Sequence, residues 1–416
     1  MGTQTAGLES ARTLPRAEAR PVARPRLAYL DNLRTALIAG VVVAHLGITY
    51  GAPADWYYKE GGELSPGVTL LWLLILILAM AFAMGLFMLI AGYCTPAAYD
   101  RKGPGRFMLD RLKRLGIPLL IFEVLINPLV HYMVDTHGGA DCTGSLYDCQ
   151  YQGTFWQYMA GYPRAKGSFG DGPVWFLEAL LLISAGYALW RIVAARRSGP
   201  ATAAPDRVRP VPGNGSIALF CLAIGLVTFV VRIWARVLVF YEPCHLELAH
   251  FPQYIALFAA GAMAYRHRWF DAFSDRQART WGWAMVACLV ILVPVLISFG
   301  ALSGEVAEGT TGGLAWESLV YSVWEGFMGV SICITLLAWF RRRFNGQGRL
   351  ARAMAGSTFG VYVLHPAIIV PFALAISDIH MNPALKYLLT APIAVALCYL
   401  VVGALRKVPV VRSILG

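Results

Sequence analysis

Charged residues are scarce in this sequence. Asp, Glu, Lys and Arg make up 14% of its 416 residues, where an average soluble domain has about 25%. Hydrophobic residues make up 57%, and they gather in runs of about 20 residues, the length of a transmembrane helix. This composition excludes a soluble globular protein. It indicates an all-α integral membrane protein, because a helix satisfies its own backbone hydrogen bonds within hydrocarbon.

The sequence also lacks a metal-binding pattern. Its eight cysteines include no Cys-x-x-Cys pair and no Cys and His spacing typical of zinc, so we expect no metal. Five of them lie in apolar runs, where cysteine behaves as a small hydrophobic residue: Cys94, Cys221, Cys288, Cys333 and Cys398. Cys142 and Cys149 lie in a polar stretch and could form a disulfide if it is extracytoplasmic, with Cys244 as a competing partner.

Acidic residues are fewer than basic ones, and the net charge is +11. The basic residues lie between the apolar runs, which is typical of charges that orient a membrane protein rather than of a nucleic-acid-binding surface. The bilayer is therefore the expected partner, and nucleic acid is not. Residues 1–27 are rich in Arg, Ala and Pro, which predicts a disordered basic cytoplasmic tail.

Ten apolar runs follow, and they predict a bundle of about ten transmembrane helices. The connections between them are alternately rich and poor in Lys and Arg, so the positive-inside rule predicts that both termini are cytoplasmic. The runs lie near 28–48, 68–96, 114–133, 173–193, 216–239, 251–266, 281–301, 318–340, 354–377 and 385–405.

The predicted transmembrane domain occupies residues 28–412. It includes an extracytoplasmic loop at 134–172 and a cytoplasmic linker at 195–214. The loop carries several aromatic residues, Trp156 among them. They could stack on a sugar ring, or they could form the aromatic belt that is common at membrane interfaces.

The first apolar run carries the most unusual pair of side chains. Arg34 and His45 are separated by ten residues, roughly 16 Å along a helix, which is about half of the hydrocarbon core. This spacing places a cation near the cytoplasmic face and an imidazole deeper in the membrane. An ionisable side chain at such a depth indicates a functional site, although a buried His can also serve packing alone.

Three further ionisable residues fall at similar predicted depths: Glu178, Glu325 and His365. We therefore predict that His365 and Glu325 join His45 in a catalytic site. The glutamates have an alternative role as ion-pair partners of Arg232 and Arg236, since buried charges require pairing.

A second group of basic residues lies near the predicted cytoplasmic face. Arg111 and Arg114 precede the third run, at the depth of Arg34. Guanidinium groups bind phosphates in bidentate geometry, so the three arginines are candidates for an anion site. Arg111 and Arg114 could instead be charges that only set topology.

Several of these stretches resemble the membrane acyltransferase-3 family. One is the Arg34 to His45 segment, and another is Phe-Met-Leu-Ile-Ala-Gly-Tyr at 87–93, where Ala91 replaces the usual Ser. The others are the Arg-x-x-Arg stretch with its following Leu-Gly-Ile-Pro at 111–118, Trp-Phe-Leu at 175–177 and Tyr-Val-Leu-His-Pro at 362–366. The Leu-Gly-Ile-Pro stretch, Trp-Glu at 324–325 and Val-Pro-Val-Val-Arg at 408–412 look most like the glucan biosynthesis protein C branch, which is associated with succinyl transfer.

The resemblance implies an O-acyltransferase in the inner membrane of a bacterium. An acetyl or succinyl group would pass from cytoplasmic acetyl-CoA or succinyl-CoA to a hydroxyl of an extracytoplasmic carbohydrate or glycolipid. Arg34, Arg111 and Arg114 would bind the acyl-CoA, and His45 would act as the base or carry the acyl group. The alternative is a transporter whose intramembrane His and Glu residues relay protons, but the sequence shows no internal repeat of the kind transporters have.

Overall fold

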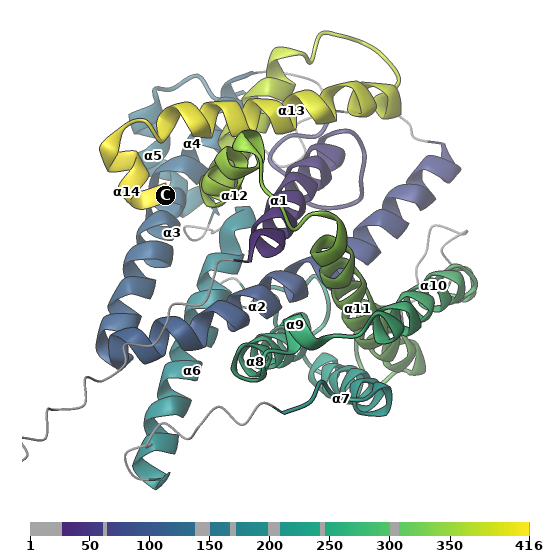
Figure 1. The fold of residues 1–416 in the computed structure, drawn as a ribbon. Helices are drawn as coiled ribbons and strands as arrows, with labels where there is room; N and C mark the ends of the chain where they lie inside the picture. The colour runs from purple at the N-terminus through teal and green to yellow at the C-terminus, as the bar shows by residue number, and fades with distance from the viewer. Residues whose placement is uncertain are drawn as a thin grey trace, which may run out of the picture.

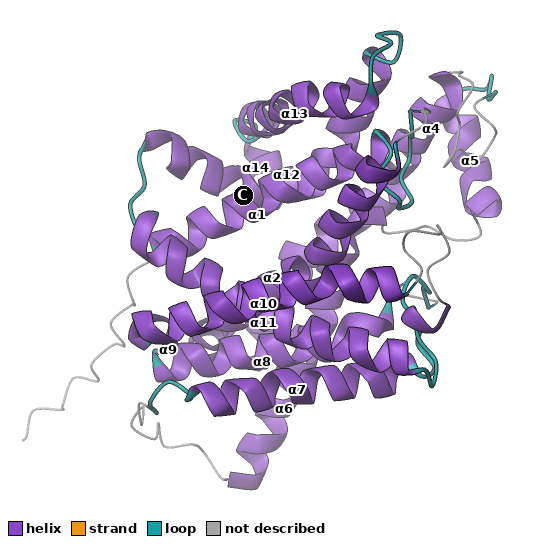
Figure 2. Ribbon diagram, turned by 90° about the vertical axis from the view of Figure 1, so that its right-hand side faces the viewer, coloured by secondary structure: helices purple, strands orange, loops and turns teal. Residues whose placement is uncertain are grey.

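The computed structural model describes residues 27–60, 65–137, 150–166, 172–198, 209–241, 246–299 and 308–415. These ranges contain helices and connections, and no strand beyond one antiparallel bridge between Tyr241 and Leu246 (Figure 2). The principal helices are α1 (Ala28–Thr49), α2 (Pro66–Arg111), α3 (Ile117–Ile121), α4 (Asn127–His137), α5 (Phe155–Lys166), α6 (Trp175–Ser198), α7 (Asn214–Arg232), α8 (Phe251–His267), α9 (Trp269–Ala272), α10 (Asp275–Ser298), α11 (Trp316–Arg343), α12 (Arg349–Ala375), α13 (Pro383–Leu405) and α14 (Pro409–Leu415).

Eight helical segments of the described chain are long and apolar enough to cross a membrane. Every predicted run falls on a helix, but the second and third lie in one continuous segment, 67–137, which bends at Gly103, where φ is 72°. The sixth run corresponds to α8, which has only 17 residues. An all-helical membrane protein is thus confirmed, whereas the count of about ten spans stays a prediction.

One end of the bundle joins connections that the charge pattern placed on a common side. Asp100, in the connection after the second run, accepts hydrogen bonds from Arg191 at 3.0 Å and Arg266 at 3.1 Å. Asn32, near the start of α1, donates to the Phe344 carbonyl after α11 at 2.7 Å. Asp100 thus joins three segments that are far apart in sequence, and Asn32 joins two more, as the predicted alternation requires.

The opposite end joins the remaining connections. The Lys386 ammonium at the start of α13 contacts the Glu60 carboxylate at 2.6 Å, and His137 at the end of α4 contacts Ser377 after α12 at 3.2 Å. The connections therefore sort into two sets, as predicted. The assignment of the first set to the cytoplasm, and with it the location of the termini, stays a prediction.

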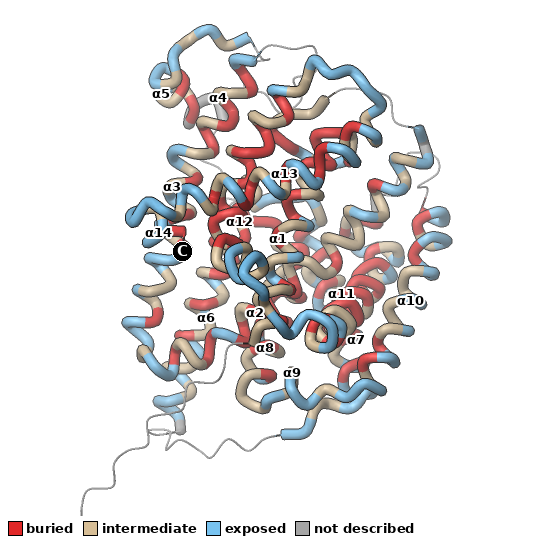
Figure 3. Tube along the Cα trace, turned by 45° about the horizontal axis from the view of Figure 1, so that its top comes forward, coloured by how far each residue is buried: buried red, intermediate tan, exposed pale blue. Residues whose placement is uncertain are grey.

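The interior lies where α1, α2, α11 and α12 meet (Figures 1 and 3). Helix α2 runs between two groups: α1, α12 and α13 on one side, and α7, α8, α10 and α11 on the other (Figure 1). The outward faces of α7, α10 and α13 expose large apolar side chains such as Leu219, Val290 and Leu400. Such faces suit contact with lipid tails rather than with water.

Helices α2 and α8 approach closely because glycines lie in their interface. A Cβ atom at Gly92 would lie 2.0 Å from the Phe258 carbonyl oxygen, and one at Gly261 would lie 2.0 Å from the Leu89 carbonyl oxygen. Small residues permit this kind of backbone approach between membrane helices. The glycine of the 87–93 stretch is therefore explained by helix packing.

Three of the predicted segments lie largely or partly outside the described residues. The tail prediction for 1–27 concerns residues of which only Leu27 is described, and Cys142, Cys149 and Cys244 are not described. The loop at 134–172 and the linker at 195–214 are described only in part.

Candidate active site

His45 and His365 lie face to face in the middle of the bundle. His45 belongs to α1 and His365 to α12, and their ring centroids are 4.9 Å apart with a tilt of 38°. The two helices pack against each other and are linked by Thr35 and Thr358, whose hydroxyl oxygens are 3.1 Å apart. His365 is fully buried, whereas His45 is partly exposed. The structure thus brings together the two predicted catalytic histidines.

Hydrogen bonds to the backbone define the tautomer of both rings. Nδ1 of His45 lies 2.9 Å from the Val41 carbonyl oxygen, and Nδ1 of His365 lies 2.7 Å from the Tyr362 carbonyl oxygen. A carbonyl oxygen only accepts hydrogen bonds, so each Nδ1 carries the hydrogen, and Nε2 of each neutral ring keeps its lone pair. No described residue hydrogen-bonds to the buried Nε2 of His365. The pair therefore presents two nitrogens that can accept a proton or attack an acyl carbon.

A loop that the sequence did not single out covers this pair. It runs from 50 to 60, and its ends are joined by a hydrogen bond from the Glu60 amide to the Thr49 carbonyl at 2.8 Å. Trp56 from this loop stacks on His45, with ring centroids 4.6 Å apart, and its centroid is 6.2 Å from that of His365. Only contact across the fold identifies Trp56, since a Trp in a short loop has no distinctive sequence pattern.

The three predicted acyl-CoA-binding arginines line one cavity of about 350 Å³. Arg34 extends from α1, and Arg111 and Arg114 extend from the end of α2 and the π-helical turn that follows it. Two further basic residues line the same cavity: Arg101 and Lys102.

Most of these cations also have a local polar partner. Arg111 donates to the Thr95 hydroxyl at 3.1 Å, and Arg114 lies 3.3 Å from the Asp110 carboxylate. Arg34 and Arg114 remain 44% and 70% exposed. Five cations and one half-buried carboxylate, that of Asp110, line this cavity, and together they form a site for an anion with several negative groups.

The histidines do not line this cavity themselves, but residues of the two helices that carry them do. Ile38 on α1 and Tyr362 on α12 both line it. Tyr362 precedes His365 by three residues, and the centroids of their rings are 6.3 Å apart. Ile38 precedes His45 by seven residues, about 10 Å along the helix. The cavity thus extends from the arginines toward the His pair.

Glu325 lies in a separate buried cluster and not beside the His pair. Its carboxylate contacts Arg232 at 2.6 Å and His250 at 2.9 Å. Arg232 is fully buried and also donates to Ser322. Of the two roles considered for Glu325, the described contacts match that of a partner for Arg232; its predicted catalytic role stays a prediction.

The same cluster contains His250, which the sequence analysis missed. His250 lies in the connection between α7 and α8, within 3.4 Å of Glu247 and 2.9 Å of Glu325. Burial alone would lower its pKa, but the two carboxylates outweigh burial and raise the pKa to about 9. The raised pKa favours the charged imidazolium of His250 between the two carboxylates.

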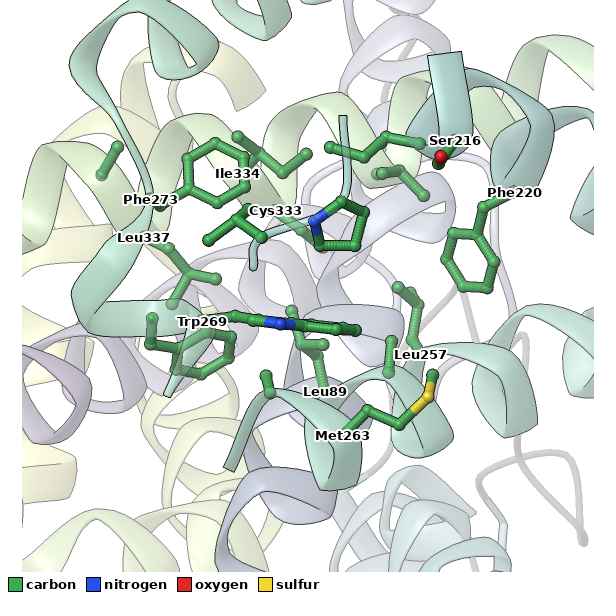
Figure 4. A pocket seen from close by; sticks show the side chains of 18 of the residues that line it. Leu89, Ser216, Phe220, Leu257, Met263, Trp269, Phe273, Cys333, Ile334 and Leu337 are labelled. Atoms are coloured by element: carbon green, nitrogen blue, oxygen red, sulfur yellow. The ribbon is translucent and has the colours of Figure 1, made fainter. Parts of the chain in front are cut away.

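A second cavity, of about 290 Å³, lies between α7, α8 and α11. Leu89, Phe220, Leu257 and Met263 are among its lining residues (Figure 4). Its one cation, Arg341, donates to backbone carbonyls of Phe270 and Phe273. This cavity suits apolar groups and offers no acid or base for chemistry among its described lining residues.

Within the described part of the chain, no cluster of His, Cys, Asp and Glu fits a metal ion.

A comparison with protein-family models shows the family to which the chain belongs. A family model described as an acyltransferase domain, acyltransferase 3, matches residues 27–403. The chain belongs to the acyltransferase-3 family. The predicted resemblance is confirmed at this level, while the glucan biosynthesis protein C branch stays a prediction. No curated protein and no solved structure matches the chain.

This acyltransferase is a multi-pass membrane protein. Membership in the family favours an enzyme over the transporter that was the alternative. The stretches that carried the resemblance now have places in the fold. Residues 34–45 and 362–366 supply the His pair, and Arg111 and Arg114 of the 111–118 stretch line the cavity together with Arg34 and Tyr362.

Proposed function

We propose that this acyltransferase moves an acetyl or succinyl group from cytoplasmic acyl-CoA to a hydroxyl of an extracytoplasmic carbohydrate or glycolipid, in the cell membrane of a bacterium. One observation carries the proposal. A single cavity is lined by Arg34, Arg111 and Arg114 at one end and by Tyr362, next to the His pair, at the other. This arrangement suits a substrate with an anionic head and a reactive group at some distance from it.

The head of that substrate would be the phosphates of CoA. Arginine remains charged and pairs with phosphate oxygens through two parallel N–H groups. Arg34 and Arg114 are exposed enough to meet a ligand from the aqueous side, while Arg111 lies deeper beside Thr95. The thioester at the end of the flexible pantetheine arm would then extend along the cavity toward the imidazoles.

Two routes of transfer fit the His pair. In the direct route, Nε2 of His45 takes the proton of the acceptor hydroxyl, the hydroxyl oxygen bonds to the thioester carbon, and the C–S bond breaks. The proton then passes to the sulfur, so CoA leaves as a thiol. In the relay route, an imidazole Nε2 bonds to the thioester carbon, the C–S bond breaks, and CoA leaves as a thiolate. The acceptor hydroxyl then bonds to the same carbon, the C–N bond breaks, and the freed imidazole takes the hydroxyl proton and releases it to water.

The acceptor would reach the pair from the other end of the bundle. The described aromatic residues there differ in accessibility: Tyr158 is buried and donates to Asp135 at 2.5 Å, whereas Trp156 is 75% exposed. Trp156 is therefore the side chain of this group that remains available to stack on a sugar or to lie at the membrane interface.

The test is thiol release by detergent-purified protein given acetyl-CoA or succinyl-CoA together with candidate glucan acceptors. We expect release that requires the protein and is lost in His45→Ala, because the base or acyl carrier is removed. His380→Ala is the matched control, since His380 is exposed after α12 and should leave the rate unchanged. A wild-type protein that neither releases thiol nor binds CoA would overturn the acyl-CoA proposal.

The same assay tests whether the chain belongs to the glucan biosynthesis protein C branch of the family. Faster release from succinyl-CoA with a glucan acceptor would support a relative of glucan biosynthesis protein C. Faster release from acetyl-CoA would instead place the chain among acetyl-transferring members.

A further inference from the structure

Trp56 combines two features that the proposed mechanism has not used. Its ring contacts both imidazoles. Its side chain is only 7% exposed, yet no described residue accepts a hydrogen bond from its indole N–H. A buried donor without an acceptor costs free energy comparable to a lost hydrogen bond. Such a group beside two candidate catalytic nitrogens requires an explanation.

Several donors around the pair are already engaged. The Tyr362 hydroxyl donates to the Pro173 carbonyl at 2.9 Å, and the Tyr57 hydroxyl donates to Asn127 at 2.5 Å. Both imidazole N–H groups are used on backbone carbonyls. Trp56 differs from these donors, because its ring stacks on His45 while no described residue accepts a hydrogen bond from its indole N–H, which is therefore available to a substrate.

The loop also holds Trp56 in a fixed position. Glu60 forms an ion pair with Lys386 on α13, with N–O distances of 2.6 and 2.8 Å, and the side chain of Lys386 is almost fully buried. The Glu60 amide closes the loop on Thr49, and Tyr57 joins it to α4 through Asn127. A donor held at both ends of its loop is preorganised, the condition under which a hydrogen bond assists catalysis most.

Acyl transfer requires such a donor. When a hydroxyl or an imidazole attacks the thioester carbon, the carbonyl oxygen becomes negatively charged, and it regains its double bond as the C–S bond breaks. Buried N–H groups that meet this oxygen stabilise the charge. Neither ring of the His pair supplies one, because each Nε2 carries a lone pair.

We propose that the indole N–H of Trp56 donates to the carbonyl oxygen of the acyl group during transfer, which makes Trp56 a catalytic residue of the site. No proton leaves the indole, so the atoms balance as in the transfer described above. This inference rests on the proposed function. It adds a substrate contact from a loop that neither arginine nor histidine motifs include.

The decisive variant is Trp56→Phe, which keeps an aromatic ring on His45 and removes the N–H. Loss of one oxyanion donor lowers kcat by about 100-fold to 1,000-fold in other acyl transfers. We expect kcat for thiol release to fall by at least about tenfold, with little change in KM for acyl-CoA. Trp283→Phe is the matched control, because Trp283 is 73% exposed on α10.

The outcomes separate this proposal from the proposed function. No thiol release by the wild type would overturn the proposed function itself. Release by the wild type, together with a kcat for Trp56→Phe within twofold of it, would overturn the role of Trp56 alone. A rise in KM without a fall in kcat would also overturn it, since a transition-state contact acts on kcat.

A measurement on the unmutated protein covers the case in which Trp56→Phe does not fold. The probe is a ketone analogue of acetyl-CoA, in which CH₂ replaces the sulfur, so the carbonyl remains but CoA cannot leave. With ¹⁵N-labelled tryptophan, we expect one indole N–H resonance to move downfield when the analogue binds. Binding of the analogue without a shift of any indole resonance would contradict the proposal.

Discussion

At the scale of single residues, Arg111 is the most informative of the cavity arginines. It is the least exposed of the three, and its guanidinium donates a hydrogen bond to the Thr95 hydroxyl, a neutral acceptor that leaves its charge uncompensated at that contact. We predict that Arg111→Ala raises KM for acyl-CoA by about 10-fold to 100-fold, the equivalent of a lost charged hydrogen bond of about 1.5–3 kcal/mol. The change in kcat should be small.

Steady-state kinetics of thiol release measure this effect. Arg279→Ala is the control, because Arg279 is an exposed arginine that does not line the cavity. Equal KM values for the two variants would show that the cavity does not bind the CoA phosphates.

His250 gives a prediction for pH at the same scale. Its pKa is raised to about 9, against about 6.5 in an unfolded chain. Its ion pairs therefore contribute fully to stability below pH 6.5, and the contribution is lost as the pH rises through 9. We expect the melting temperature of the wild type to fall between pH 7 and pH 10, and to fall less in His250→Gln. Parallel curves of melting temperature against pH for the two proteins would contradict this account of the cluster.

At the scale of helices, the contact between α2 and α8 depends on the absence of side chains. A Cβ atom at Gly261 would overlap the Leu89 carbonyl oxygen, which belongs to rigid backbone. We predict that Gly261→Ala lowers the free energy of unfolding by about 1–3 kcal/mol, as overpacking does. Thermal unfolding of the wild type and the variant in detergent measures this loss of stability.

The matched control lies on α10. A Cβ atom at Gly282 has its nearest neighbour, the Thr335 hydroxyl, at 3.9 Å, an ordinary contact. Gly282→Ala should therefore be neutral or slightly stabilising, because Ala favours helix by up to about 1 kcal/mol. An equal loss of stability in both variants would show that the α2 and α8 backbones are not held in close contact.

The helices and the site differ in how far sequence predicts them. Apolar runs identified every long helix, since hydropathy alone determines which segments enter hydrocarbon. The pairing of His45 with His365 was predicted from depth, and the structure confirms that they meet. Depth alone left two roles open for Glu325, and its described contacts are with Arg232 and His250; its catalytic role stays a prediction. Trp56 and His250 were missed because their environments arise only from contacts between distant segments.

At the scale of the whole molecule, the positions of cavity and loop are those that the proposed direction of transfer requires. The arginines lie at the end of the bundle where Asp100 joins Arg191 and Arg266, and the Trp56 loop lies at the end where Glu60 meets Lys386. The His pair lies between them. Donor and acceptor should therefore approach the same imidazoles from opposite faces of the membrane.

Transfer across a sealed bilayer tests this claim most directly. Proteoliposomes would enclose a glucan acceptor, receive radiolabelled acyl-CoA outside, and contain protein molecules oriented with the arginine end outward. We predict labelled glucan in the lumen with the wild type and none with His45→Ala. Labelled product that forms only when donor and acceptor share one side of the membrane would contradict the account.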